Sequence, residues 1–246
     1  MKHIIYMKKT VWMLLFAAGA ALASCSEEEL DPQSIFDVSS PERTSFDTWL
    51  YMNYTVPYNI QFNYKYIDRE SDNTYNLVPA DIEKAEVMAK VTKYLWIDSY
   101  TELLGPEFMM TYCPRMIQLI GSKAYNSQGS VVLGTAEGGQ KITLYNVNEL
   151  DIKNLSISFL NYWFFKTMHH EFAHILHQTK NYSTDFNLIS TDYQGPSWLN
   201  LEDDAQANRM GYVTRYASYA PDEDFVEIIS NYVTNPDGYW DTVLTT

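Results

Sequence analysis

The sequence is poor in cysteine and in basic residues, and each shortage excludes a class of protein. Its 246 residues include only 2 Cys, too few for the disulfide framework of a small secreted domain. Lys and Arg number 17 against 31 Asp and Glu, for a net charge of −14. That balance excludes electrostatic binding to nucleic acid or to an anionic membrane surface. No apolar run reaches the ~20 residues of a membrane-spanning helix. With 46% hydrophobic and 15% aromatic residues, the chain is typical of a folded globular protein.

The first 24 residues have the pattern of an export signal. Lys8 and Lys9 precede a short apolar run over residues 11–23. The run leads into Leu22-Ala23-Ser24-Cys25, which resembles the cleavage box of bacterial lipoproteins, where the cysteine thiol takes a diacylglycerol and becomes the acylated first residue. Several acyl chains together anchor a protein stably. An ordinary cleaved signal with an incidental cysteine is the alternative.

An acidic, Ser- and Pro-containing stretch follows over residues 25–42 and has the composition of a tether. Its run Glu27–Glu29 resembles the surface-export tag of Bacteroidetes lipoproteins, with a plain solvated linker as the alternative. We therefore predict a signal over 1–24, an acylated Cys25 and acidic tether over 25–42, and one domain over 43–246. If Cys25 is acylated, Cys113 has no intramolecular disulfide partner, and we predict that it is a small buried apolar residue.

The hydrophobic patterning of the domain predicts strands first and helices later. Alternating residues indicate strands over 58–67, 115–120, 130–135 and 140–147, the last two joined by a hairpin turn at Glu137-Gly138-Gly139. Helical spacing predicts helices over 81–104, ended by Gly105-Pro106, and over 157–178, with Asn154 or Ser156 able to cap it. Two further helices are expected near 202–216 and 222–234, after a loop over 181–200. This order predicts an α+β fold with a mixed sheet and helices on one side.

Four of the 5 His fall within nine residues, in the predicted helix over 157–178. They include the motif His170-Glu171-x-x-His174. Residues four apart lie on one helix face, so both imidazoles can reach the same ion. Glu171 projects beside that face, where it can accept a proton from a metal-bound water. The pattern therefore predicts a catalytic zinc site.

A catalytic zinc needs a third protein ligand, and the predicted helix near 222–234 offers carboxylates. Glu223 and Glu227 lie one turn apart on that helix, so one can bind the metal while the other supports a ligating histidine. Asp224 directly follows Glu223, so the ligand could shift by one residue. His177 is a rival third ligand, although it lies roughly 10 Å along the helix axis from His170. We favour a supporting or packing role for His177.

The motif HHEFAHILHQ, the later YASYAPDEDFVE and the lipoprotein leader together resemble the zinc-binding metallopeptidase lipoproteins of Bacteroidetes. These are also called substrate import-associated zinc metallohydrolase lipoproteins. The resemblance implies a zincin fold of the gluzincin kind, with the mixed sheet packed on the HExxH helix and a helical C-terminal half. It implies Glu223 as the third zinc ligand, Glu227 as its partner four residues on, and Tyr216 as the group that stabilises the oxyanion. Relatives are expected to run on into a further helix after the ligand helix, whereas this chain ends at Thr246.

These residues predict a zinc-dependent hydrolase, most simply a metallopeptidase acting on a peptide or protein substrate. The strand over 140–147 is the edge where an extended peptide would pair, by analogy to zincins. The resemblance adds an outer-membrane, cell-surface location and a TonB-dependent importer with its binding lipoproteins as partners. One alternative is a non-catalytic nutrient-binding lipoprotein with a structural or vestigial zinc, in which Trp198 and Tyr193 would contact the nutrient. Another is hydrolysis of a non-peptide bond.

Overall fold

The computed structural model describes residues 42–125, 131–132, 134–137 and 140–246. Residues Arg43–Thr246 form one compact unit. The predicted leader, Cys25 and nearly all of the predicted tether lie outside the described residues, as do Ser130 and Gly138-Gly139 of the predicted turn. Within the described part of the chain, no helix is long and apolar enough to cross a membrane.

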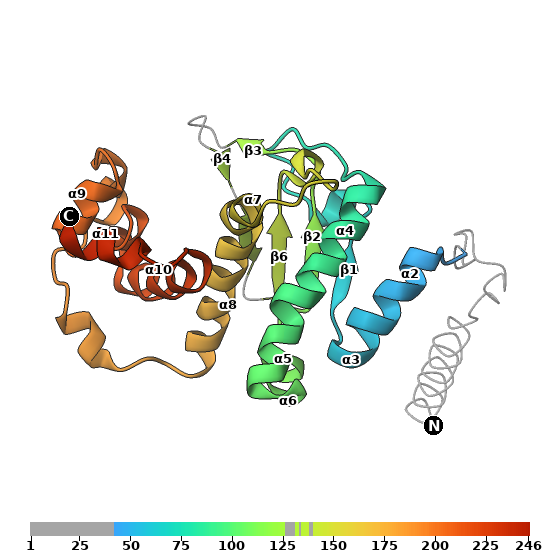
Figure 1. The fold of residues 1–246 in the computed structure, drawn as a ribbon, viewed down its shortest axis with the longest axis horizontal. Helices are drawn as coiled ribbons and strands as arrows, with labels where there is room; N and C mark the ends of the chain where they lie inside the picture. Colours follow the sequence, from blue (N-terminus) through green and yellow to red (C-terminus); the bar gives the residue numbers. More distant parts are fainter. Residues whose placement is uncertain (1–41, 126–130, 133, 138–139) are drawn as a thin grey trace, which may run out of the picture. The chain divides into compact units, whose positions relative to one another are not determined.

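A four-stranded mixed sheet organises the first half of the unit (Figure 1). Its strand order is β1-β2-β6-β5, with bounds Gln61–Asn63, Met116–Leu119, Lys141–Leu144 and Gly134–Glu137. The first three strands are parallel, and β5 runs antiparallel to β6 at the edge. Ile117 of β2 pairs with Phe62 and Ile142 on its two neighbours, so apolar side chains align across one face. A second, antiparallel pair is formed by β3 (Ala124–Tyr125) and β4 (Val131–Val132).

Two long helices pack against that apolar face. The first comprises α4 (Ile82–Thr92), the π-helical turn η3 (Lys93–Ile97) and α5 (Asp98–Leu104). The Asp81 side chain caps its start by accepting from the Glu83 and Lys84 amides. Gly105, with a φ of +87°, ends it, and Pro106 begins the short helix α6 (Pro106–Tyr112).

The second long helix has the same construction. It comprises α7 (Ile157–Leu160), the π-helical turn η5 (Asn161–Phe165) and α8 (Lys166–Thr179), and the Ser156 hydroxyl caps it. Strand β5 approaches α8 so closely that a Cβ on Gly134 would lie 2.5 Å from Thr167 Cγ2. Only glycine fits there, because a real Cβ does not come so near another carbon.

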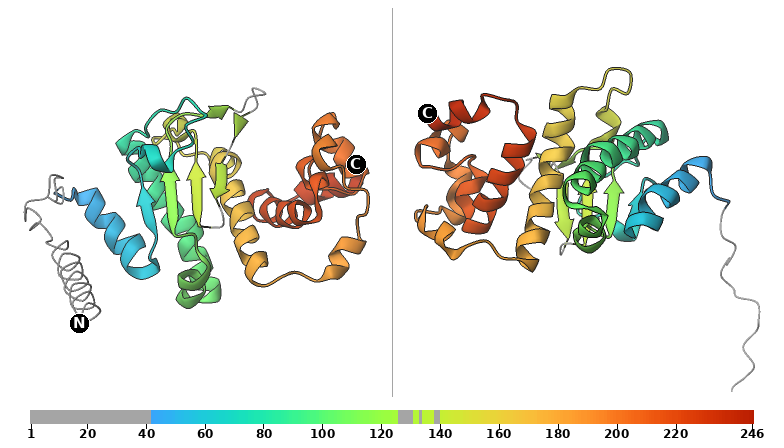
Figure 2. Two further views of the ribbon diagram at one scale, coloured as in Figure 1. Left: turned by 180° about the vertical axis from the view of Figure 1, so that it is seen from behind. Right: turned by 60° about the horizontal axis from the view of Figure 1, so that its bottom comes forward.

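The remaining elements flank this centre. Before the sheet come α2 (Ser45–Leu50), the π-helical turn η1 (Tyr51–Thr55) and α3 (Val56–Tyr58), and two 3₁₀ turns occupy η2 (Asp68–Glu70) and η4 (Val147–Glu149). After α8 come the 3₁₀ segments η6 (Thr184–Leu188), η7 (Gly195–Asn200) and η8 (Tyr216–Tyr219), and the helices α9 (Asp204–Arg209), α10 (Pro221–Thr234) and α11 (Tyr239–Thr245). These C-terminal helices lie on the opposite side of α8 from the sheet (Figure 2).

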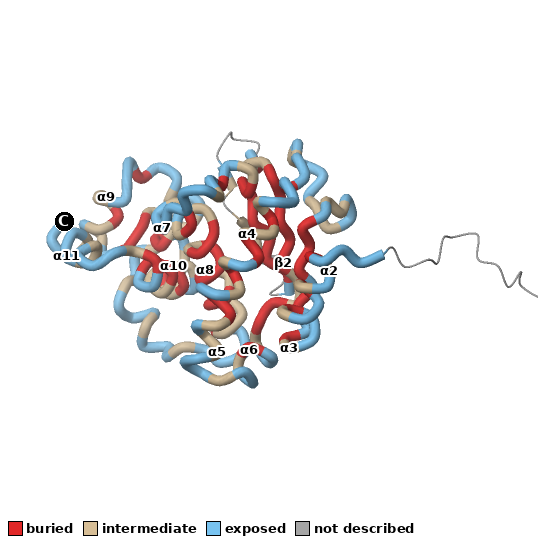
Figure 3. The backbone as a smooth tube through the Cα atoms, turned by 45° about the vertical axis from the view of Figure 1, so that its right-hand side comes forward, coloured by how far each residue is buried: buried red, intermediate tan, exposed pale blue. Residues whose placement is uncertain are grey.

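The buried residues gather where these layers meet. The main core joins the sheet, α4 and the inner face of α8, and its largest fully buried side chains include Trp96 and Phe172. In Figure 3 the buried segments run through the strands and through the facing sides of α8 and α10. Cys113 belongs to this core, as predicted, and burial raises the pKa of its thiol to about 11.

The predicted fold class is confirmed, whereas several element boundaries are wrong. The strand expected over 58–67 is limited to β1, because Tyr58 ends a helix and Asn59 turns the chain with a φ of 55°. The strand expected over 130–135 is divided between two sheets as β4 and β5. The helix expected near 202–216 is limited to α9, and α11 supplies a further helix after α10. The strand over 140–147 is not an edge: β6 lies between β2 and β5, so β5 is the edge strand.

Candidate metal centre

Three side chains from two helices converge at the centre of the unit. His170 and His174 project from one face of α8, and Glu223 projects from the first turn of α10, which packs against α8. Glu223 Oε2 lies 3.2 Å from His170 Nε2 and 3.3 Å from His174 Nε2. The one-turn spacing of the histidines and the close packing of the two helices together produce this cluster.

The cluster fits a zinc ion. With metal–ligand bonds of about 2.0–2.1 Å, the ligands of a tetrahedral zinc lie about 3.3 Å apart. Both His–Glu separations match that edge. The donor set of two imidazole nitrogens and one carboxylate oxygen also leaves a fourth position open, which is the pattern of catalytic rather than structural zinc sites.

Carboxylates make this position favourable for positive charge. Burial lowers the pKa of His170, but its hydrogen bonds to Glu223 and Glu227 outweigh burial and raise the pKa to about 9. Burial likewise raises the pKa of Glu223, but the two histidines lower it to about 2. A cation between these groups would replace the proton and keep all three side chains paired.

Glu227 holds His170 from the side away from Glu223. Its Oε1 lies 3.0 Å from His170 Nδ1. Its Oε2 accepts a hydrogen bond from the Thr214 hydroxyl at 2.7 Å and one from the Asn231 amide at 3.2 Å, and Lys166 Nζ lies 3.3 Å away. With Nδ1 bonded to this fixed carboxylate, His170 presents Nε2 to the cluster.

His177 stands in the same relation to His174. Its Nε2 lies 3.0 Å from His174 Nδ1, so it fixes that ring from outside the cluster. His169 lies on another face, where it is buried and bonds the Tyr100 hydroxyl through Nδ1 at 2.9 Å. The structure therefore separates the four histidines into two that face Glu223, one that supports His174 and one in the core.

The two candidate acids on α10 point in different directions. Asp224 is buried and accepts a hydrogen bond from the Tyr193 hydroxyl at 3.0 Å, away from the histidine pair. Burial raises the pKa of Asp224 to about 6. Glu223 is therefore the carboxylate that the structure brings to the histidines, and the Tyr193 hydroxyl bonds α10 through Asp224.

Glu171 and Tyr216 border a cleft beside the cluster, which we call the metal cleft. It has a volume of about 550 Å³, and its wall includes Gly134 of the edge strand, His170 and Trp198. Burial raises the pKa of Glu171, although the neighbouring histidines lower it. The Tyr216 ring is stacked on that of His170, with centroids 6.0 Å apart, and the Trp198 ring meets it edge-on at 5.0 Å. Burial and Glu223 raise the pKa of the Tyr216 phenol.

Three further residues of this site, which the sequence alone did not suggest, are Lys166, Thr214 and Asn231. A signal existed for two of them, because Lys166 lies four residues before His170 and Asn231 four after Glu227, each one helical turn away. Thr214 has no such signal, since it reaches Glu227 from the irregular segment before η8.

Comparison with known proteins gives the following likenesses. Residues 39–246 match the model of a family described as "Putative zinc-binding metallo-peptidase". The chain is also similar to a putative zinc-binding metallo-peptidase from Bacteroides caccae with a solved crystal structure. The two share 45% sequence identity and a TM-score of 0.71, over 86% of this chain and 80% of the other. No curated protein matches the chain.

Proposed function

Because the chain belongs to the zinc-binding metallo-peptidase family, we propose that it is a zinc-dependent hydrolase whose substrates are peptides or proteins. The observation that supports this most strongly is the convergence of His170, His174 and Glu223 at separations that fit zinc, with Glu171 beside them in a cleft. A purely structural zinc has no use for a general base and fills its fourth position with protein.

The chemistry follows from the side chains around the cluster. Zinc, when bound, polarises a scissile carbonyl and lowers the pKa of a water molecule to about 7. Glu171 accepts a proton from the attacking water and returns it to the departing amine, for which a raised pKa is an advantage. Tyr216 donates its hydroxyl hydrogen to the oxygen that gains negative charge, and its raised pKa keeps that proton in place. Glu227 and His177 keep the two imidazoles in orientation.

A peptide fits the metal cleft because one wall is a sheet edge. Gly134 of β5 lines the cleft, and among the strands of the described residues β5 pairs with β6 alone, so β5 is the edge to which we assign an extended chain. In this proposal β5 takes the peptide-pairing role that the sequence had suggested for the strand over 140–147.

The first experiment measures zinc per chain and cleavage of a peptide library. We expect about one zinc per chain in both the wild type and Glu171→Gln. The wild type should hydrolyse peptides, and Glu171→Gln should not. His174→Ala should lose both. Glu223→Ala should lower zinc affinity far more than Asp224→Ala, which is the matched control one residue away. Unchanged turnover in Glu171→Gln would contradict the mechanism. A zinc-loaded chain that cleaves no peptide would instead favour hydrolysis of another bond or a binding role.

We further propose that the domain is tethered to the outer membrane and faces the cell exterior, beside a nutrient importer. The support is the lipoprotein-like leader, Cys25 and the acidic run that follows it. Labelling of the protein with a radioactive fatty acid, and its digestion by protease added to whole cells, would test both points. Cys25→Ala should lose the label. Protection from external protease would contradict surface exposure.

A further inference from the structure

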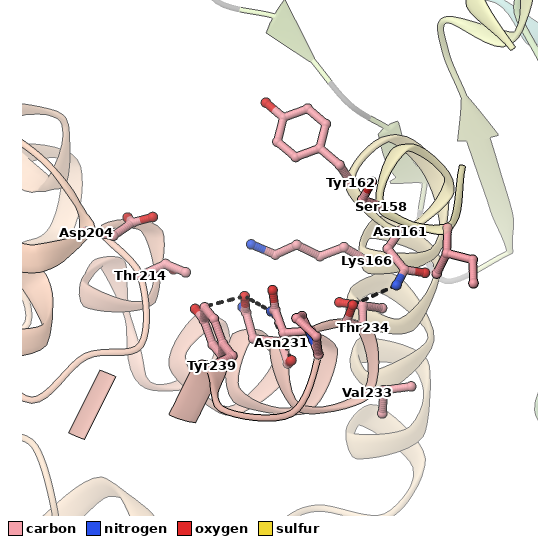
Figure 4. Close-up of a pocket in the computed structure, with 13 residues that line it drawn as sticks. Ser158, Asn161, Tyr162, Lys166, Asp204, Thr214, Asn231, Val233, Thr234 and Tyr239 are labelled. Carbon is pink, nitrogen blue, oxygen red and sulfur yellow. Dashed lines mark hydrogen bonds between the residues drawn. The ribbon is translucent and has the colours of Figure 1, made fainter. Parts of the chain in front are cut away.

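A second cavity adjoins the metal cleft, and we call it the side cavity. It has a volume of about 820 Å³ and lies between the start of the long second helix and the C-terminal end of α10 (Figure 4). Lys166, Asp204 and Thr214 line both spaces, so a substrate bound in the metal cleft can extend into the side cavity. Neutral groups dominate the rest of its wall, including Asn161, Asn231, Asn235, Tyr162 and Tyr239.

Lys166 is the cation that lies between the two spaces. Figure 4 shows its side chain extending across the side cavity from α8. Among the described lining residues the other cation is Arg215, whose guanidinium donates to the Leu201 carbonyl and lies 3.9 Å from Asp204. Both cations thus lie near a carboxylate, but Lys166 is the one whose side chain extends across the side cavity.

Glu227 does not use up the donors of Lys166. An ammonium group carries three N–H donors, and the Lys166 ammonium forms an ion pair with Glu227 Oε2 at 3.3 Å. The same oxygen also accepts shorter bonds from Thr214 and Asn231, so Glu227 stays bonded when Lys166 shares its charge. Only 28% of the Lys166 side chain is exposed, so a second partner would meet a partly dehydrated charge.

We propose that Lys166 binds a carboxylate of the substrate residue that follows the scissile bond, and that the side cavity receives the rest of that residue. This inference rests on the proposed peptidase function. Two side chains separate Lys166 from the cluster: the Lys166 ammonium lies 3.3 Å from Glu227, and Glu227 lies 3.0 Å from the ring of His170, whose far nitrogen faces Glu223. Because Lys166 lines both the metal cleft and the side cavity, the carboxylate we assign to it is the one nearest the scissile carbonyl carbon on that side, which is carried by the following residue.

The bound carboxylate is either the C-terminus of the substrate or an Asp or Glu side chain. The hydrolysis itself is the same in both cases. Water adds its oxygen to the carbonyl carbon, the C–N bond breaks, and the proton taken by Glu171 passes to the amine. The departing product carries the carboxylate as its C-terminus or as an Asp or Glu side chain. A C-terminal source makes the enzyme a carboxypeptidase, and a side-chain source makes it an endopeptidase that cuts before acidic residues.

The test compares matched peptides with the full chain in its zinc-loaded form. One N-acylated peptide ends in a free carboxylate, its twin ends in an amide, and a third amidated peptide has Glu after the scissile bond in place of Gln. We expect the carboxylate-bearing peptides to be cleaved at least about tenfold faster, in kcat/KM, than their neutral twins. Lys166→Met should abolish that ratio, Lys166→Arg should retain most of it, and the exposed control Lys153→Met should leave it unchanged.

Binding supplies a readout that does not depend on turnover. Zinc-loaded Glu171→Gln should bind the free-acid peptide about tenfold more tightly than the amide, and adding Lys166→Met should make the two equal. Each comparison is the ratio of acid peptide to neutral peptide for one protein variant. A partial loss of folded or zinc-loaded protein lowers both values equally and therefore leaves the ratio unchanged. Equal cleavage of acid and neutral peptides by the wild type would overturn this inference while leaving the peptidase function standing. Absence of any peptide cleavage, with equal binding of the twins, would overturn both.

Discussion

The two sides of helix α8 are held together by different chemistry. On the sheet side, one large core of aromatic and aliphatic side chains includes Trp96, Phe164 and Phe172, all fully buried. On the other side, after Thr179, the fully or nearly buried apolar cluster is small, with Leu201, Ala207, Tyr212, Val213 and Ala217 as members.

Hydrogen bonds from tyrosine to aspartate supplement that small cluster. Tyr193 donates to Asp224, and Tyr212 donates to Asp192 at 2.9 Å. The facing side chains of α8 and α10 then join at the His–Glu cluster. We infer that hydrophobic burial stabilises the sheet side, whereas polar bonds and the metal stabilise the helical side.

Removal of a core ring on the sheet side should have the largest effect. Trp96→Ala removes a fully buried indole that packs against Tyr100 and Phe172, and should lower the free energy of unfolding by about 3–5 kcal/mol. Urea unfolding measures it. Tyr94→Ala, at a side chain 72% exposed in the same π-helical turn, is the control and should change stability by less than about 0.5 kcal/mol. Similar losses of stability for both variants would contradict the inference that burial of apolar side chains stabilises the sheet side.

Removal of zinc should affect the helical side. At a free zinc concentration 100 times its Kd, binding adds about 2.7 kcal/mol of stability, which a chelator removes. Hydrogen exchange followed by mass spectrometry should then show faster exchange in α9, η8 and α10 and little change in α4 and α5. His174→Ala, which lacks a ligand, should show no response to the chelator. Uniform loss of protection over the whole unit would mean that the two sides open together.

Loss of one tyrosine hydroxyl on the helical side should have a smaller effect. Tyr212→Phe removes the bond to Asp192 but keeps the fully buried ring, and should cost about 1 kcal/mol. Tyr232→Phe is the control, at a side chain 71% exposed on α10. An effect of Tyr212→Phe no greater than that of the control would show that these hydrogen bonds do not stabilise the helical side.

The smallest effect is expected at the start of α2, on the sheet side, where one charge contributes. Desolvation raises the pKa of Asp47, but the Thr44 amide, the Tyr64 hydroxyl and Lys65 lower it to about 2, below the ordinary 3.8. The folded state therefore gains stability from the ionised carboxylate above about pH 4 and loses it as the pH falls towards 2. Asp47→Asn should cost about 0.5 kcal/mol at pH 6 and almost nothing at pH 2. A pH-independent difference would contradict this account.

Sequence reasoning predicted the helices better than the strands, for a physical reason. The helices around Met88 and His174 have long amphipathic patterns and clear caps at Asp81 and Ser156. The strands have only two to four residues. The alternating pattern over Tyr58–Ile67 therefore could not reveal that only the three residues Gln61–Asn63 form a strand. Which strand forms the edge depends on long-range pairing, and the sequence does not contain that information locally.

The site shows the same limit. The spacing of His170, Glu171 and His174 is local to one helix and could be predicted, and the structure brings Glu223 to the histidines as the resemblance implied. The contacts of Glu227 with Thr214 and Lys166 could not be predicted from the sequence, because they depend on how a loop and two helices meet.

The π-helical turn η5 has a consequence for how this protein tolerates changes in chain length. It occupies Asn161–Phe165, directly before Lys166, and contains none of the zinc-facing residues. Each residue of an α-helix advances the direction of the next side chain by about 100°. A π-helical turn holds about one residue more than an α-helical turn, so a one-residue deletion in η5 would rewind it as α-helix and keep His170 and His174 in phase with the buried Leu160. An insertion has no wider turn to remove and would rotate the histidine pair by about 100° relative to Leu160, so η5 tolerates the loss of a residue better than the gain of one.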